Sequence, residues 1–297
     1  MSIEVQPLAS RPTPPQKKTR LGMVLRELRK APITAWFGMI VILGYVIVAL
    51  FAHVIAPYGE SQVFDQPYAP WSDEFRLGTD QLGRDLMTRL IYGARNTLGI
   101  AVMTTLLSFA VGGGLGILAA VRGGWIDQLI GRVVDVLMAI PYLVFALMLL
   151  SIFGSTILNI IIIIALLDCT RVFRLARAVA MNVAVMDYVE AAKLRGEGLG
   201  WIMRREILPN VMPPLVAEFG LRFCFVFLTI SALSFLGVGI QPPTADWGSM
   251  VRENSTLITY GNITPLLPAG AIALLTVAVN FVVDWFLHKT SGLRDEH

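Results

Sequence analysis

Six mostly apolar stretches dominate the sequence, and all but the fourth are long enough to cross a membrane without including polar residues at an end. A helix needs roughly 20 apolar residues to cross about 30 Å of hydrocarbon, and only helices or closed barrels satisfy their backbone polar groups there. Hydrophobic residues make up 55% of the 297-residue chain and charged residues only 15%. The sequence therefore predicts an all-α polytopic membrane protein with six transmembrane helices, at 34–55, 97–121, 129–153 with a kink at Pro141, 157 to about 174, 215–236 and 264–287.

The distribution of positive charge predicts which side of the membrane each loop occupies. With the amino terminus inside, 18 of the 24 lysines and arginines fall on the cytoplasmic side. Cytoplasmic loops carry the excess of such residues. We therefore expect cytoplasmic tails at 1–33 and 289–297, with residues 21–30 as a basic amphipathic helix, around a transmembrane domain at 34–288. The slightly basic net charge reflects this orientation and gives no ground for nucleic-acid binding.

A polar segment at about 187–210 interrupts the apolar runs on the predicted cytoplasmic side. Asp187 and Glu190 have the spacing of a capping box, and Gly196 stands where a left-handed residue closes a helix. Tyr188, Ala191, Ala192 and Arg195 recur at helical spacing, which predicts one face with two small residues. So short a helix is marginal in water by itself. Its pattern indicates a knob that docks in a groove of another protein.

This segment resembles the coupling loop of permease subunits in binding-protein-dependent ABC importers. The resemblance rests on Glu190, Ala191, Ala192, Gly196, Leu208 and Pro209, although Glu206 replaces the aliphatic residue usual two positions before the leucine. It implies that the helix, with Tyr188 and Arg195, docks on an ATPase subunit. The alternative is a capped helix in a cytoplasmic loop, in which Glu190 only satisfies backbone donors.

A second motif follows the first apolar run, in the predicted outer loop. Thr79 or Asp80 could cap a helix with an apolar face of Leu82, Leu86 and Leu90, leaving Arg84, Asp85 and Arg89 on the wetter side. The simple interpretation is an interfacial helix that leads into the next span. The motif also resembles the signature of C-type subunits of dipeptide, oligopeptide and nickel importers, carried by Gly78, Thr79, Asp80, Gly83, Arg84 and Asp85. The segment 241–248 resembles the same subfamily.

Few residues in the apolar runs carry charge. Glu218 and Arg222 stand four residues apart in the favourable order, so they predict either a structural salt bridge or a substrate or gating role. Arg171, Arg174 and Arg177 recur every three residues, which is typical of a helix that emerges at the headgroups. The three histidines lack metal-ligand spacing, so no metal site is expected. Cys169 and Cys224 are expected to be packing residues.

The resemblance implies a type I permease in a bacterial inner membrane that forms half of a pathway with a homologous permease subunit. It also implies an extracytoplasmic binding protein and ATPase subunits that hold ATP and magnesium; this chain has no phosphate-binding loop and is expected to bind no cofactor. Lipid would surround it. Short peptides are the expected cargo, with nickel chelates, opines or other small solutes as the alternative.

A different class, an intramembrane enzyme or an ion-coupled carrier, generally needs ionisable groups near mid-membrane. Asp135, Asp168, Glu218, Arg222 and Asp284 are instead expected near the cytoplasmic ends of their spans. The sequence therefore favours a transport subunit without enzymatic activity of its own.

Overall fold

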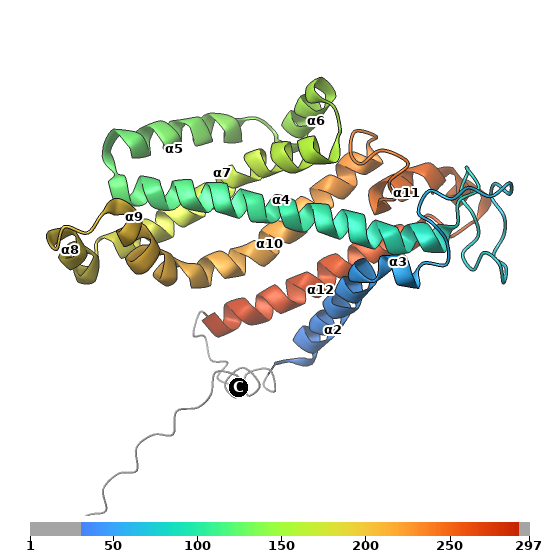
Figure 1. The fold of residues 1–297 in the computed structure, drawn as a ribbon, viewed down its shortest axis with the longest axis horizontal. Helices are drawn as coiled ribbons and strands as arrows, with labels where there is room; N and C mark the ends of the chain where they lie inside the picture. Colours follow the sequence, from blue (N-terminus) through green and yellow to red (C-terminus); the bar gives the residue numbers. More distant parts are fainter. Residues whose placement is uncertain (1–30, 291–297) are drawn as a thin grey trace, which may run out of the picture.

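A computed structural model describes residues 31–290. Within this range the chain is helical apart from loops, and Figure 1 shows the long helices lying side by side. The helices are α2 Ile33–Leu50, α3 Ala52–Ile55, α4 Leu86–Arg122, α5 Gly124–Ala139, α6 Tyr142–Phe153, α7 Ile157–Ala184, α8 Asp187–Leu194, α9 Leu199–Ile202, a π-helical turn Met203–Ile207, α10 Leu208–Phe235, α11 Trp247–Asn254, a 3₁₀ helix Ser255–Tyr260 and α12 Leu266–Thr290.

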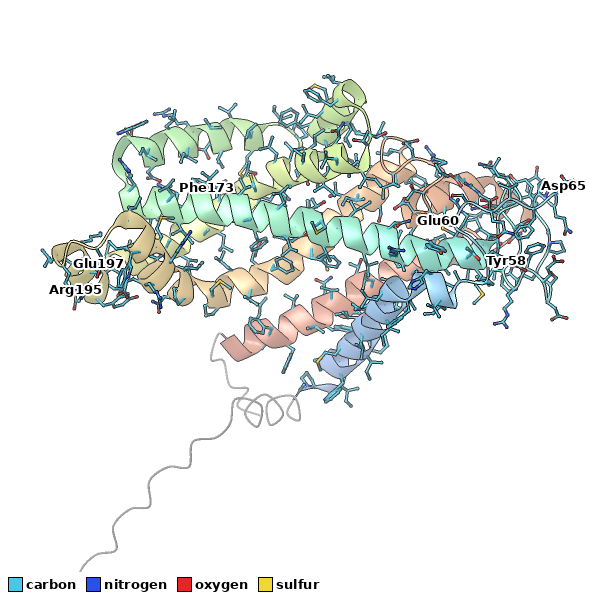
Figure 2. The ribbon with its side chains drawn as sticks, viewed as in Figure 1. Tyr58, Glu60, Asp65, Phe173, Arg195 and Glu197 are labelled. Atoms are coloured by element: carbon cyan, nitrogen blue, oxygen red, sulfur yellow. The ribbon has the colours of Figure 1, made fainter. Side chains whose placement is uncertain are left out.

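The two ends of the molecule differ in structure. One end, called here the α8 end, consists of α8, α9 and the π-helical turn (Figure 1). The opposite α11 end consists of the loop at 56–85, α11 and the 3₁₀ helix. Arg195 and Glu197 lie at the first end and Tyr58 and Asp65 at the second (Figure 2).

Close packing of α4 against α7 forms the centre of the bundle. A Cβ atom on Gly112 would collide with the Cys169 carbonyl, and one on Gly116 with the Phe173 carbonyl. Small residues let helix backbones approach in this way in membrane proteins. The apolar core continues through α6 and α10, where Leu150, Ile164, Phe227 and Ile230 are buried.

The first and last long helices pack on each other beside this centre. A Cβ atom on Gly38 of α2 would meet the Ala278 carbonyl of α12, and Phe37 contacts Phe281 edge-on. Tyr45 of α2 donates a hydrogen bond of 3.0 Å to the Ala271 carbonyl. Most other side chains of α2 are exposed, as expected of a helix surrounded by lipid.

The predicted kink at Pro141 is a complete break in the helix. Neither α5 nor α6 alone is long enough to cross a membrane. Together they are long and apolar enough, and the angle between them is 90°. Ile140 and Pro141 have extended backbones between them. Proline lacks the N–H that would continue the helix, and it disfavours α geometry at the residue before it.

The all-α fold is confirmed, and the predicted spans differ from the helices in several bounds. Among residues 31–290, four helices are long and apolar enough to cross a membrane, or five spans if the bent pair is one. The helix that follows the bent pair, α7, has 28 residues and continues ten residues beyond the predicted end at Arg174. The predicted helix at 21–30 and most of both predicted tails lie outside the described residues.

The fifth predicted span begins earlier than expected. Pro213 and Pro214 lie inside α10 instead of opening it. Proline removes one helical hydrogen bond and leaves the carbonyl four residues earlier without a donor. Those carbonyls belong to Pro209 and Asn210, which are exposed, so solvent can satisfy them without breaking the helix.

Candidate functional site

The predicted coupling helix is α8, and the chain's own core holds it in place. Val189 and Ala192 are fully buried against a cluster that contains Ala176 and Ala180 of α7 and Ile207. A helix of eight residues therefore does not need a partner to form. The opposite face, with Tyr188, Glu190, Ala191, Lys193, Leu194 and Arg195, is exposed. Tyr188 and Leu194 are 42% and 84% exposed, unusually high for large side chains.

Two details of the predicted coupling helix are corrected. Ala192 does not share the exposed face with Tyr188 and Ala191, because the stripe that packs on the core runs through Val189 and Ala192. Asp187 is the first helical residue instead of the cap, and the cap position belongs to Met186, whose side chain makes no capping hydrogen bond. Asp187 and Glu190 still lie in the first turn, where their negative charges interact favourably with the helix dipole and stabilise the helix.

The end of α8 has the predicted geometry. Gly196 has φ +82°, and its N–H donates to the Lys193 carbonyl at 3.0 Å. The Glu197 N–H donates to the Ala192 carbonyl at 3.2 Å, which completes a Schellman motif. This sharp exit sends the chain directly into α9.

The second half of the predicted loop returns to the bundle. Leu208 lines an apolar pocket of about 560 Å³ between α4 and α10, with Phe109 and Met212. Pro209 is exposed in the first turn of α10. Because Pro209 has no N–H to bond the carbonyl four residues before it, the helix there widens to a π-helical turn, in which the Leu208 N–H bonds the Met203 carbonyl.

The motif predicted for the outer loop forms a buried cluster of charges, called here the clamp. Thr79, Asp80, Arg84 and Asp85 are at most 3% exposed. The Thr79 hydroxyl donates to the Gln66 carbonyl at 2.6 Å, and Asp80 accepts from Arg84 Nε at 2.6 Å. Positive φ angles at Gly78 and Gly83 allow two turns pressed on neighbouring backbone, where a Cβ atom would meet the Ala69 and Phe64 carbonyls.

The predicted helix start and the predicted wet face of this motif are both wrong. The helix α4 begins at Leu86, and its cap is Asp85, whose carboxylate accepts from the Thr88 N–H at 2.7 Å. Leu82, expected on the apolar face, is 50% exposed, whereas Arg84 and Arg89 are buried. Burial of these two arginines is possible because both pair with carboxylates.

Glu253 completes the clamp, and sequence reasoning missed it. Its carboxylate lies 3.0 Å from Arg84 Nη2 and 3.5 Å from Arg89 Nη2, while Arg89 Nε lies 3.5 Å from Asp80. The four charges therefore join the loop at 56–85, α4 and α11. No local pattern could reveal a partner 169 positions after Arg84.

The start of α11 closes the same end of the molecule. Asp246 caps α11 through the Ser249 N–H at 2.9 Å and accepts from the Thr97 hydroxyl at 2.9 Å. Burial raises the pKa of the Asp246 carboxyl, and these hydrogen bonds oppose that rise. The indole of Trp247 is buried against Gly93 and donates to the Leu90 carbonyl at 2.9 Å.

The predicted pair of Glu218 and Arg222 belongs to a larger interior cluster. Arg222 Nε lies 2.8 Å from Glu218, and Arg222 Nη1 lies 3.6 Å from the fully buried Asp168. Ser108 of α4 donates to Asp168 at 2.9 Å. Asp168 and Arg222 lie near the middle of α7 and α10. Because α7 extends ten residues beyond its predicted span and α10 begins seven residues before its own, the middle of each helix is not the middle of the predicted span.

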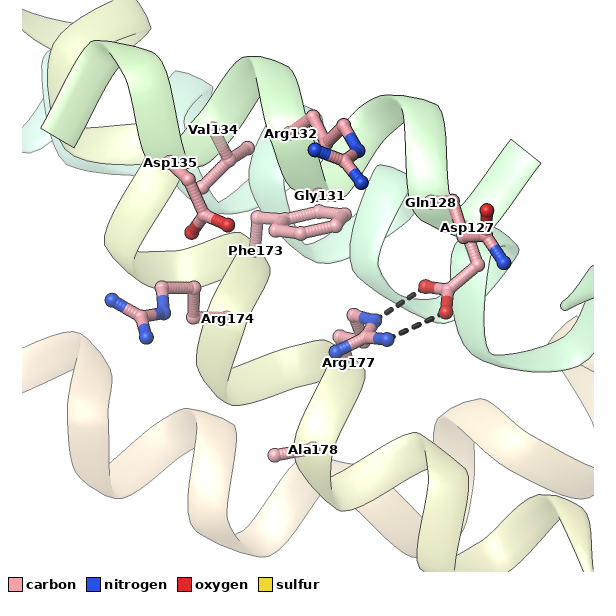
Figure 3. A pocket seen from close by; sticks show the side chains of 10 residues that line it. All are labelled: Asp127, Gln128, Gly131, Arg132, Val134, Asp135, Phe173, Arg174, Arg177 and Ala178. Carbon is pink, nitrogen blue, oxygen red and sulfur yellow. Dashed lines mark hydrogen bonds and ion pairs between the residues drawn. The ribbon is translucent and has the colours of Figure 1, made fainter. Parts of the chain in front are cut away.

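A further charged pocket of about 570 Å³ lies between α5 and α7 (Figure 3). Asp127 and Arg177 form a bidentate ion pair at its wall, and Arg132, Asp135 and Arg174 also line it. In residues 31–290 no group of three His, Cys, Asp or Glu side chains is arranged to hold a metal ion.

The long apolar helices, with a short helix exposed at one end and a buried clamp at the other, are the features of a multi-pass membrane protein. Residues 112–289 match the family described as the binding-protein-dependent transport system inner membrane component, and residues 19–70 match the N-terminal TM domain of oligopeptide transport permease C. The chain belongs to this family of ABC importer permeases.

Two curated relatives cover most of the chain. The di/tripeptide transport system permease protein DppC of Pseudomonas aeruginosa is 38% identical over 87% of this chain and 85% of its own. The dipeptide transport system permease protein DppC of Alkalihalophilus pseudofirmus is 32% identical over 91% and 86%. A solved amino acid ABC transporter with histidines aligns with a TM-score of 0.47 at 19% identity, over 68% of this chain and 94% of that one.

Proposed function

We propose that this chain is the permease subunit that forms half of the pathway of a short-peptide importer. Its relatives at 38% and 32% identity are named for the transport of dipeptides and tripeptides, which favours peptides over nickel chelates or opines. A homologous permease subunit would supply the other half. A binding protein outside the membrane would deliver the peptide, and membrane lipid would surround the bundle.

Energy would reach the permease at α8. The observation that carries this proposal is the outward face of α8, with Tyr188, Ala191 and Arg195 exposed while Val189 anchors the helix in the core. A groove on an ATPase subunit could receive this face, with ATP and magnesium bound by that subunit. Glu190, Gly196, Leu208 and Pro209 would set the helix and its exit. Ala192 would support the helix from its buried face.

The orientation follows from charge. With α8 in the cytoplasm, both chain termini are also cytoplasmic, and the clamp of Asp80, Arg84, Arg89 and Glu253 faces outward. Gly78, Thr79, Gly83 and Asp85 would then shape the outer surface near the binding protein. Because the clamp residues are buried, we assign them to the shape of that surface and not to contact with the peptide.

Reconstitution tests the proposal. The chain, its partner permease, the ATPases and the binding protein are placed in vesicles, and accumulation of a labelled dipeptide is measured. We expect accumulation only with ATP and binding protein together, and competition by other dipeptides but not by a nickel chelate. Accumulation driven by an ion gradient without ATP would contradict the proposal in favour of an ion-coupled carrier.

A further inference from the structure

Three arginines of α7 follow one face of the helix. Arg171, Arg174 and Arg177 are three residues apart, and residues at that spacing are neighbours on a helix surface. Arg174 and Arg177 line the pocket between α5 and α7 shown in Figure 3. Arg171 lines a second pocket of about 290 Å³ at the break between α5 and α6. The three arginines therefore line two pockets, and their positions are not explained only by the end of a membrane span.

The two pockets adjoin. Met138 lines the pocket at the break, Arg174 lines the pocket between α5 and α7, and Arg174 Nη1 contacts Met138 Sδ at 3.7 Å. The row of arginines thus runs from the break in the helix towards the α8 end. Interrupted helices in membrane proteins are tolerated where they border protein or a water-filled cavity, and such breaks often mark binding sites.

The arginines differ in their partners. Asp127 neutralises Arg177 through two hydrogen bonds. Arg171 and Arg174 form no ion pair with any residue between 31 and 290. The nearby carboxylate of Asp168 is held by Ser108 and lies beside Arg222. Arg171 therefore has no carboxylate within ion-pair distance among the described residues, and Asp168 acts on it only from farther away.

Two aromatic rings hold Arg171 in position. Its guanidinium carbon lies 4.4 Å from the centre of the Phe225 ring and 5.1 Å from that of Tyr142. Such cation–π contacts favour a desolvated guanidinium but do not use its in-plane N–H donors. The guanidinium is thus oriented in advance for a planar anion, and a carboxylate matches its fork through two parallel hydrogen bonds.

We propose that Arg171 binds the carboxylate terminus of the peptide in the pocket at the α5–α6 break, and that Arg174 receives it next. This inference rests on the proposed function. The other lining residues include the apolar Leu137, Met138 and Phe145, which can contact varied peptide side chains. The pocket is close to the lower limit of about 300 Å³ for small-ligand sites. Because every linear peptide carries the carboxylate, one arginine would serve cargo of any sequence.

The test compares arginine variants in the reconstituted transporter, with dipeptide accumulated per ATP hydrolysed as the measurement. Arg171→Gln should lower this ratio about tenfold, the effect expected from losing a charged hydrogen-bond donor. Arg171→Lys, which keeps the charge but loses the two parallel N–H donors, should restore only part of it. The control is Arg122→Gln, an exposed arginine at the end of α4, which should leave the ratio unchanged.

The outcomes separate this inference from the proposed function. A wild-type transporter that accumulates no dipeptide with ATP overturns the proposed function. A wild-type ratio in Arg171→Gln overturns only the inference. If the wild-type ratio falls to that of Arg171→Gln when anionic lipid is omitted from the vesicles, Arg171 binds lipid phosphate and the inference is also overturned.

A second measurement leaves Arg171 in place. Met138 lines the same pocket and is 36% exposed, so Met138→Cys should react with a small thiol reagent. Dipeptide supplied during turnover should slow this reaction severalfold. The native thiols Cys169 and Cys224 are buried, and their background is measured in the wild-type chain. Absence of protection by the dipeptide would overturn the inference.

Discussion

At the scale of single residues, α8 separates two alanines that look alike in the sequence. Ala191 is exposed and Ala192 is fully buried. Helical spacing brings both near Tyr188, but it does not say which stripe faces the bundle. The two positions therefore serve different purposes, one at the surface proposed to meet an ATPase and the other in the core that supports it.

Substituting each alanine with tryptophan distinguishes the surface role of Ala191 from the core role of Ala192. Ala192→Trp should destabilise the chain itself by about 1–3 kcal/mol through overpacking, seen as a lower Tm in detergent. Ala191→Trp should leave the Tm unchanged but reduce the ATP hydrolysis stimulated by loaded binding protein. Normal stimulation in Ala191→Trp, at normal expression, would remove this face of α8 from the coupling proposal.

Two neighbouring glycines offer a matched pair for backbone strain. Gly196 has φ +82° and Gly198 has φ −70°, and a Cβ atom would meet nothing within 4 Å at either position. Gly196→Val should thus cost about 1–2 kcal/mol from left-handed geometry alone. Gly198→Val should cost much less. We expect a lower Tm and weaker stimulated ATP hydrolysis only for Gly196→Val; equal effects would show that the positive φ does not matter.

At the scale of elements, the clamp determines where α4 begins. The helix starts at Leu86 after the Asp85 cap, and the buried charges connect its first turn to the loop at 56–85 and to α11. Buried ion pairs add little net stability when intact, but removing one member leaves an uncompensated charge. The clamp therefore specifies how these elements are arranged.

Arg89 and Arg95 test the clamp on a single helix. Arg89→Ala leaves Asp80 and Glu253 without one of their cations, so it should destabilise the protein by about 3–5 kcal/mol. Arg95 is exposed, and Arg95→Ala should change stability by less than about 0.5 kcal/mol. Thermal unfolding and protease cleavage of the loop at 56–85 would measure both. A similar Tm for the two variants would mean that the buried charges contribute no net stability.

At the scale of the whole molecule, the proposed orientation places the two ends on opposite sides of the membrane. Ser72 lies exposed in the loop of the α11 end, and Glu197 follows α8 at the other end (Figure 2 labels Glu197). The positive-inside rule is the physical basis for the assignment.

Labelling with an impermeant thiol reagent in intact spheroplasts tests the orientation. A cysteine at Ser72 should react, and a cysteine at Glu197 should react only after the membrane is opened. The buried Cys169 and Cys224 should contribute little background. Reaction at Glu197 but not at Ser72 in intact cells would reverse the proposed topology.

The sequence alone was sufficient wherever a property depends on neighbouring residues. Apolar runs predicted the helical membrane fold, and Gly196 predicted the end of α8. Both follow from local chemistry: the cost of an unpaired backbone in lipid and the positive φ that glycine tolerates.

Only the tertiary structure decided which charges and small residues face inward. The sequence predicted that Arg84 and Arg89 face solvent, but in the structure they are buried and pair with Glu253 and Asp80. It also predicted that Ala192 is exposed, but Ala192 is buried against α7. The same holds for Asp168, which meets Arg222 and Ser108 from other helices. Burial of a polar group depends on partners that lie far away in the chain, because only their contact offsets the cost of removing it from water.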